Sequence, residues 1–396
     1  MEVKFSGFAN LALTYEDSDQ LDFMGSILNN PRDGLSPWSD SSLGGQVNLQ
    51  VSDNVDAVAQ IVFNDRSDTD LSNYLTLGFV RYRPNRNWAL RAGRMNNNIY
   101  ILSEYLAAGY AYLWSRPPLD FYSPASAIRS MDGVEAQYSR YIGDGFLQTS
   151  LQFGKTETSL DGVGGSFELK LKKIIVWTAN YEVANWLFKG SYVTATTQTP
   201  DSTDFQALIN AFNAVPSYLW PAAAQYADDL DPEDGNIKYL ALGMQYDDGD
   251  WTMQAELAQV DSDWLLFLPG RFGYISLGYH WGEFTPYVKI ASNRRSDDVP
   301  EIVAPAFSDA VPQEVQIGIY TLAGAANMVV NGSTNKQYSL GLGVRWDFAD
   351  SMALKMQLDR FYISPPGASL WGLENTANAV NKQQVNVFSL GLSTIF

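Results

Sequence analysis

Apolar and polar residues alternate along almost the whole chain, in segments of about ten residues, and helical periodicity is nearly absent. In the first segment, 3–15, Val3 and Phe5 lie on one side of the pattern and Lys4 and Ser6 on the other. A period of two places every second side chain on the same face of a β-strand. The sequence therefore predicts an all-β fold, and we count about 16 strands.

The connections between these strands are alternately short and long. The short ones are 52–54, 84–87, 142–145, 183–185, 247–249, 282–283 and 348–350. The long ones are 16–41, 64–73, 96–131, 156–166, 196–236, 261–270, 293–335 and 361–383. This alternation, with both chain ends on the short side, predicts a transmembrane antiparallel up-and-down β-barrel with short periplasmic turns and long extracellular loops. The barrel occupies residues 1–396 as a single domain, because closure leaves no free sheet edge in lipid.

Aromatic residues flank six of the short turns, as Tyr82 and Trp88 do for the second turn. Amphipathic rings favour the membrane–water interface, so we interpret them as one aromatic girdle. Ordinary cross-strand ring pairing near hairpins is the alternative interpretation. The first turn carries Val51 and Val55 instead. We therefore hypothesise that the first three strands face a neighbouring subunit.

The composition excludes several classes of protein. The chain has 44 acidic and 26 basic residues, a formal net charge of −18, which argues against a nucleic-acid partner. It has no cysteine and one histidine, His280, so thiolate chemistry and histidine-based metal or catalytic sites are not expected. We predict that the protein is not an enzyme. Its first residues do not resemble a secretory signal, so we expect either a cytosolic protein or one whose signal was removed before Met1 was added.

The chain resembles a Gram-negative outer-membrane porin of the 16-stranded, usually trimeric kind. The resemblance covers the whole chain and rests on the strand count, the loop alternation, the alternating last segment that ends in Phe396, and the long third loop. That loop lies between the runs 91–94 (RAGR) and 132–134 (DGV). The resemblance implies that segment 96–131 folds into the lumen as a constriction loop. It also implies the bacterial outer membrane as location, lipids and lipopolysaccharide as contacts, a homotrimer, and passive diffusion of small hydrophilic solutes and ions.

The face opposite the apolar one carries eleven basic and seven acidic residues, so we expect a modestly basic lumen and some preference for anionic solutes. Arg81, Arg83 and Arg91 lie on neighbouring strands and predict a basic ladder, with Glu104 or Asp120 of the third loop opposite. Solvated lumen charges without a steering role are the alternative. The full set of predicted pore-lining residues is Arg81, Arg83, Arg91, Glu104, Arg116, Asp120, Glu135, Lys189 and Lys355.

The long loops hold much of the acidic excess. The densest cluster lies in the fifth loop, in Asp228, Asp229, Asp231, Glu233 and Asp234. These carboxylates are candidate ligands for calcium or magnesium, bound directly or as a bridge to lipopolysaccharide phosphates; a solvated, repulsive loop is the alternative. No other cofactor is expected. The same loop predicts a short helix over 203–212, because apolar residues recur there at i, i+3, i+4 and i+7.

Other functions stay open at this point. The third loop carries seven aromatic residues: Tyr100, Tyr105, Tyr110, Tyr112, Trp114, Phe121 and Tyr122. They would suit a channel specific for sugars or for aromatic or carboxylate solutes. Packing of the loop against the barrel wall is the alternative interpretation. A barrel whose main task is to bind a protein partner is another possibility. An energy-coupled receptor would need a plug domain, for which the sequence before Val3 has no room.

Overall fold

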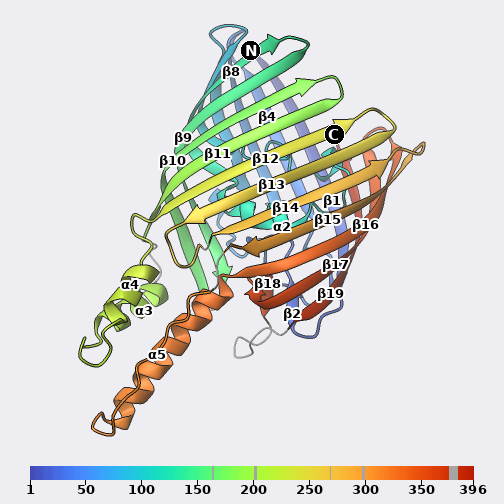
Figure 1. Ribbon diagram of the computed structural model, residues 1–396. Helices are drawn as coiled ribbons and strands as arrows, with labels where there is room; N and C mark the ends of the chain where they lie inside the picture. Colours follow the sequence, from blue (N-terminus) through green and yellow to red (C-terminus); the bar gives the residue numbers. More distant parts are fainter. Residues whose placement is uncertain (163–164, 200–202, 268, 297–298, 374–381) are drawn as a thin grey trace.

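A computed structural model describes residues 1–162, 165–199, 203–267, 269–296, 299–373 and 382–396. Within these residues the sequence forms one closed antiparallel sheet, drawn in Figure 1, of sixteen long strands and the two-residue strand β3 (Leu35–Ser36). The sixteen are β1 (Glu2–Glu16), β4 (Ser42–Gln50), β5 (Val55–Asn64), β6 (Leu75–Tyr82), β7 (Trp88–Asn96), β8 (Ser130–Ile142), β9 (Gly145–Gly162), β10 (Gly165–Val183), β11 (Trp186–Gln198), β12 (Asn236–Asp247), β13 (Trp251–Ser262), β14 (Gly270–Tyr279), β15 (Phe284–Arg295), β16 (Asn335–Ala349), β17 (Met352–Ala368) and β19 (Gln383–Ile395).

The first and last strands close the barrel. Strand β1 pairs with β4 on one side and with β19 on the other, in a register that runs from Phe8 opposite Ile395 to Glu16 opposite Val387. Beyond β19, the terminal residue still takes part: the backbone N–H groups of Gly7 and Phe396 each donate to the other's carbonyl, at 2.7 and 3.0 Å. The predicted barrel, its strand count and its seven short turns are thereby confirmed.

The alternation of apolar and polar residues gives the barrel an apolar outer face and a polar inner face. Large apolar side chains such as Leu242 and Leu257 are exposed on the outer face, whereas Lys189, Gln357 and Asp359 are buried on the inner face. Rings near the short turns pair across neighbouring strands, as Trp186 and Tyr246 do with centroids 4.6 Å apart. Several of them also stay exposed, among them Tyr82, Trp88, Trp251, Trp281 and Phe284. The same aromatic residues therefore both pair across neighbouring strands and form an outward-facing girdle.

The loops depart from the prediction in two places. The fourth connection is not a long loop: β9 and β10 continue pairing from Phe146 opposite Glu182 to Gly162 opposite Gly165, and predicted loop residues 163–164 lie outside the described part. Helices are also more extensive than predicted. The helix predicted over 203–212 is confirmed as α3 (Thr203–Asn213), but α2 (Leu119–Ala125), α4 (Ala223–Leu230) and the 20-residue α5 (Gln313–Gly332) were not predicted. No described helix has the length and hydropathy that a membrane-crossing helix requires.

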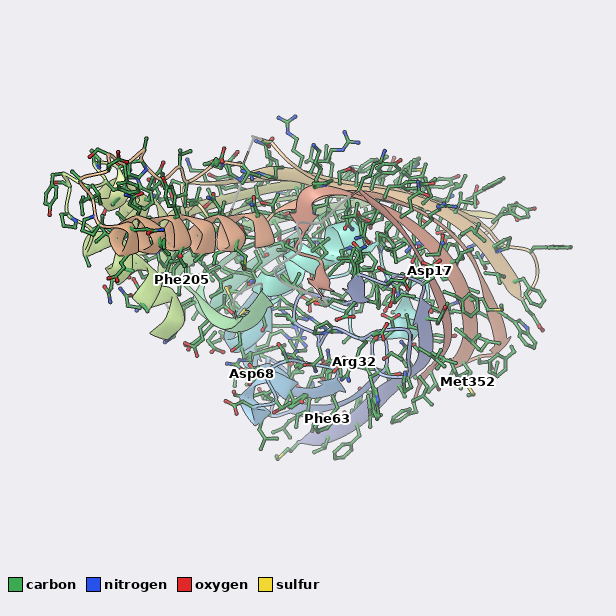
Figure 2. All side chains as sticks on the ribbon, turned by 90° about the horizontal axis from the view of Figure 1, so that it is seen from below. Asp17, Arg32, Phe63, Asp68, Phe205 and Met352 are labelled. Atoms are coloured by element: carbon green, nitrogen blue, oxygen red, sulfur yellow. The ribbon has the colours of Figure 1, made fainter. Side chains whose placement is uncertain are left out.

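Smaller elements lie within the loops. Strands β2 (Leu21–Phe23) and β18 (Trp371–Leu373) pair with each other. The remaining short elements are α1 (Leu71–Tyr74), η1 (Gly109–Ala111) and η2 (Ser126–Ile128). Figure 2 looks from the loop end and shows Arg32 and Asp68 on loops at the mouth of the barrel.

The third loop, between β7 and β8, lies inside the barrel. Its residues Ile99, Tyr100, Trp114 and Phe121 are almost fully buried and belong to one apolar cluster with inward side chains of the wall, such as Tyr274. These contacts therefore show that segment 96–131 folds into the barrel, as the resemblance implied. Rings of this loop pack against the wall, as Phe121 does on Tyr274 at 5.3 Å between centroids.

Glycines allow the strands on either side of this loop to approach closely. Gly93 lies opposite Gly133, and Gly133 lies opposite Gly154 on the next strand. A Cβ atom at Gly133 would lie 2.0 Å from the carbonyl oxygen of Phe153 and 2.8 Å from the Cα of Gly154, both of them backbone atoms that cannot move aside alone. The sheet therefore requires a residue without a side chain at Gly133, the glycine of the DGV run that follows the loop.

We predict that Gly133→Ala lowers stability by about 1–3 kcal/mol, because the added methyl must displace a neighbouring strand. The temperature at which the folded band disappears in a denaturing gel should fall. Gly45→Ala is the matched control, since a Cβ at Gly45 meets no atom within 4 Å. Equal melting of the two variants would contradict the steric argument.

Candidate functional site

The beginning of the third loop is fixed to strand β11 and strand β13. The Lys189 ammonium donates to the Asn98 side-chain oxygen at 2.6 Å, and the Ser191 hydroxyl donates to the Ile99 carbonyl at 2.6 Å. The backbone N–H of Ile101 donates to the carboxylate of Glu256 at 2.8 Å. Inward polar residues of the wall therefore serve first to hold the loop.

Glu256 also anchors the helix at the end of the loop. Its Oε1 accepts hydrogen bonds from the hydroxyls of Tyr122 and Tyr274, the second at 2.7 Å. Gln254 donates to the Tyr274 hydroxyl at 2.6 Å. A single buried carboxylate thus ties together the start of the loop, helix α2 and strand β14.

Basic residues of β16 and β17 hold the middle of the loop by its carbonyls. The buried Lys355 ammonium donates to the carbonyl oxygens of Gly109, Tyr112 and Trp114, at 2.5, 2.5 and 2.9 Å. Arg345 donates to the carbonyls of Tyr110 and Tyr112, at 2.8 and 2.9 Å. Sequence reasoning placed Lys355 in the lumen wall. In the structure its ammonium group donates hydrogen bonds to backbone carbonyls of the third loop.

Arg116 lies at the centre of a buried charge cluster. Its guanidinium contacts Asp40 of the first loop at 2.7 Å and Asp359 of β17 at 2.8 Å. Lys289 of β15 contacts the same Asp359 at 3.1 Å. All four side chains are at most 7 % exposed, so two cations and two carboxylates neutralise one another away from water.

The predicted basic ladder is paired with carboxylates of the same wall. Arg81 and Arg83 both contact Asp56, at 2.8 and 2.5 Å. Arg91 contacts Glu135 of the adjacent strand at 2.8 Å and Glu104 of the third loop at 3.3 Å. Glu104 therefore contacts one member of the ladder, Arg91, directly and does not face it across an open gap.

Asp120, the other predicted counter-charge, lies far from the ladder. It is fully buried against β15 and β16, where its carboxylate accepts hydrogen bonds from Gln337 at 2.9 Å and Ser339 at 2.5 Å. The ladder and Asp120 are thus not brought together. The role of these residues in conduction stays a prediction.

Two arginines that sequence reasoning missed lie where three cavities meet. The outer cavity, of about 610 Å³, and the middle cavity, of about 130 Å³, are both lined by Arg66 and Arg129. Arg129 also lines the inner cavity of about 550 Å³, which reaches Phe396 at the short-turn end. We call the middle cavity, the smallest of the three, the neck.

The end of the third loop places Arg129 in this position. Its carbonyl accepts a hydrogen bond from the backbone N–H of Asn97 at 2.9 Å, so the loop closes on itself where it leaves and re-enters the sheet. The Nε of Arg129 is buried and has no hydrogen-bond partner. Arg66 comes from the second loop, and its Nε donates to the Asn64 side chain at 3.0 Å.

The neck has an excess of positive charge. Its lining contains Arg66, Arg116 and Arg129 but one carboxylate, Asp40, which Arg116 occupies. Within the described residues neither Arg66 nor Arg129 forms an ion pair. Burial, and secondarily the nearby Arg129 charge, lowers the pKa of Arg66 to about 10, so the Arg66 side chain remains cationic at neutral pH.

The acidic cluster of the fifth loop is engaged with protein groups. Glu233 contacts the Lys172 ammonium at 2.7 Å and accepts hydrogen bonds from the backbone and hydroxyl of Thr199, and these contacts lower the pKa of Glu233 to about 2. Within the described residues, no three acidic or histidine side chains are grouped so as to share a metal ion. The calcium or magnesium site stays a prediction.

The fold is that of solved outer-membrane porins, which confirms the predicted fold class. OmpF of Salmonella typhi, in a complex with daunomycin, matches 100 % of this chain and 97 % of its own, with a TM-score of 0.55 at 11 % identity. An anion-selective porin from Comamonas acidovorans gives 0.53 at 12 % identity, over 100 % and 99 % of the two chains. The outer-membrane channel DcaP of Acinetobacter baumannii gives 0.53 at 12 %, over 100 % and 97 %. No protein-family model and no curated protein sequence matches the chain.

We predict that Asp359→Ala costs about 3–5 kcal/mol of unfolding free energy, because the buried Arg116 keeps only Asp40 and the buried Lys289 loses its ion pair. Urea unfolding in detergent measures the loss, and faster tryptic cleavage after Arg129 would report a loosened third loop. Asp132→Ala is the control, since it removes an exposed pair with Arg94 and should cost less than about 1 kcal/mol. Similar losses in both variants would refute the anchoring role of the buried cluster.

Proposed function

We propose that the protein is a passive diffusion channel of the Gram-negative outer membrane, selective by charge for small anionic solutes. The observation that carries this proposal is the neck, where Arg66 and Arg129 form no ion pair within the described part of the chain, while the predicted lumen arginines contact carboxylates. A solute that moves between the outer and inner cavities passes Arg129, which lines both. A charge beside the narrowest point of a pore favours ions of the opposite sign.

The outer face supports the membrane location. Exposed apolar side chains on the strands are followed by aromatic rings at the short-turn end, which is the surface that a barrel in lipid presents. Lipids and lipopolysaccharide are the expected contacts of this surface. The same fold serves an anion-selective porin in Comamonas acidovorans, although identity of 12 % transfers the fold alone.

Recognition of sugars or aromatic solutes by the third loop is less favoured. Four of its seven aromatic residues, Tyr100, Trp114, Phe121 and Tyr122, are at most 4 % exposed. Rings buried against the wall have no face left on which a solute could stack.

We predict that Arg129→Ala lowers the ratio of chloride to potassium permeability roughly five-fold. A unit charge about 8 Å from an ion in a wet pore contributes roughly 0.5 kcal/mol, with opposite signs for anion and cation. Reversal potentials in planar bilayers under a potassium chloride gradient measure this ratio. Arg129→Lys, which keeps the charge, is the matched control and should retain the wild-type ratio; an unchanged ratio in Arg129→Ala would refute the neck as the selective point.

We also propose a homotrimer assembled through β1, β4 and β5. These strands expose large apolar side chains, such as Phe5 and Leu11, while the short turn that joins β4 and β5 lacks aromatic residues. Leu49→Cys in the intact assembly should be protected from a lipid-soluble thiol reagent, and Leu257→Cys on β13 should react. Equal labelling at the two positions would contradict the interface.

A further inference from the structure

The fifth and seventh loops build an extension with a hydrophobic core of its own. Helices α3, α4 and α5 project from the loop end, and Figure 2 shows α5 reaching sideways beyond the barrel wall. Asn327 of α5 fastens the preceding segment, donating to the Ile302 carbonyl at 2.8 Å and accepting from its N–H at 2.9 Å. The core of the extension includes Ile209, Phe212, Trp220, Ala227, Ile319 and Ala326.

Helix α5 has two apolar faces, and the core of the extension covers one of them. The covered stripe is Ile319, Ala323, Ala326 and Val330. On the opposite side, at the same spacing, lies what we call the outer stripe: Ile317, Thr321, Gly324 and Met328. Ile317 is 56 % exposed and Met328 is 41 % exposed. The helix has no charged residue after Glu314, although the outer face of a solvated helix is normally polar.

The glycine of the outer stripe has no role in the packing of the extension. A Cβ at Gly324 would meet no atom within 4 Å, and the same holds for Gly318 one turn and a half earlier. A glycine inside a helix costs roughly 1 kcal/mol relative to alanine. Small residues on a helix surface allow the backbone of another helix to approach closely. A partner helix would therefore account for these positions.

Charge narrows the chemistry of that partner. Segments 199–235 and 296–334, to which the described residues of the extension belong, contain seven and five acidic residues in sequence and no lysine or arginine. A second copy of this extension would bring acidic surfaces together, and lipopolysaccharide phosphates would be repelled for the same reason. A surface that carries lysine and arginine around an apolar ridge is complementary.

We propose that the outer stripe of α5 is a docking surface for a partner protein that presents an apolar helix face flanked by lysine and arginine. The apolar ridge would cover Ile317 and Met328 and approach the backbone at Gly324. The basic flanks would meet the carboxylates of the extension, of which Glu314 lies in the first turn of α5 itself. The barrel would thus display a binding site at the mouth of its pore, independent of the charge at the neck.

The test uses the full chain in nanodiscs of zwitterionic lipid and a fluorescent 20-residue helical peptide of leucine, alanine and lysine, with the leucines on one face. We expect this peptide to bind at least ten-fold more tightly than a scrambled peptide of the same composition. Gly324→Gln and Ile317→Ser should each weaken binding at least five-fold. Ala224→Gln, an exposed change on α4, is the matched control and should leave binding unchanged.

Three outcomes would overturn the proposal. Equal binding of the scrambled peptide would mean attraction by charge alone. Equal binding of a peptide with glutamate in place of lysine would exclude a basic partner. Dissociation of an oligomer of the chain by Ile317→Ser, measured by analytical ultracentrifugation, would assign the stripe to contacts between copies.

Discussion

The pairing of β1 with β19 is the interaction on which the rest of the structure depends. A sheet in lipid cannot leave backbone N–H and carbonyl groups unpaired, because no water is present to satisfy them. The register from Phe8 opposite Ile395 to Glu16 opposite Val387 meets this requirement at the one place where residues most distant in sequence must find each other. Closure then turns one face of every strand toward an enclosed lumen, where charges can be buried in pairs.

The lumen uses most of its charges for architecture. Glu256, Lys355 and the cluster around Arg116 each fix a different part of the third loop, so the inward polar face acts as a set of anchors. Burying these groups is favourable only because each finds a partner. Arg66 and Arg129 differ because their positions, at the start of the second loop and the end of the third, leave them without an ion pair among the described residues. We therefore expect the charge selectivity of the pore to come from the few lumen residues that form no ion pair, such as Arg66 and Arg129 among the described residues.

The extension shows how a barrel can add a second surface without disturbing the first. The strands that carry it, β11 to β12 and β15 to β16, keep their regular register below the loops. The extension buries its own apolar side chains, so its sequence is constrained by helix packing and not by the membrane. Its acidic surface explains much of the negative net charge of the chain, while the neck is locally positive.

The sequence by itself determined the strands, the two kinds of connection, and the polar and apolar faces, because a period of two and a turn are local properties of the chain. The inward third loop was implied only by the resemblance to porins. The sequence also predicted that Arg91, Lys189 and Lys355 line the pore, and that role stays a prediction. It did not determine which charges meet. Arg116 and Asp359 are 243 residues apart, and Arg129 is isolated only because of the path that the third loop takes. Contacts of that range depend on closure and loop packing, which the tertiary structure alone decides.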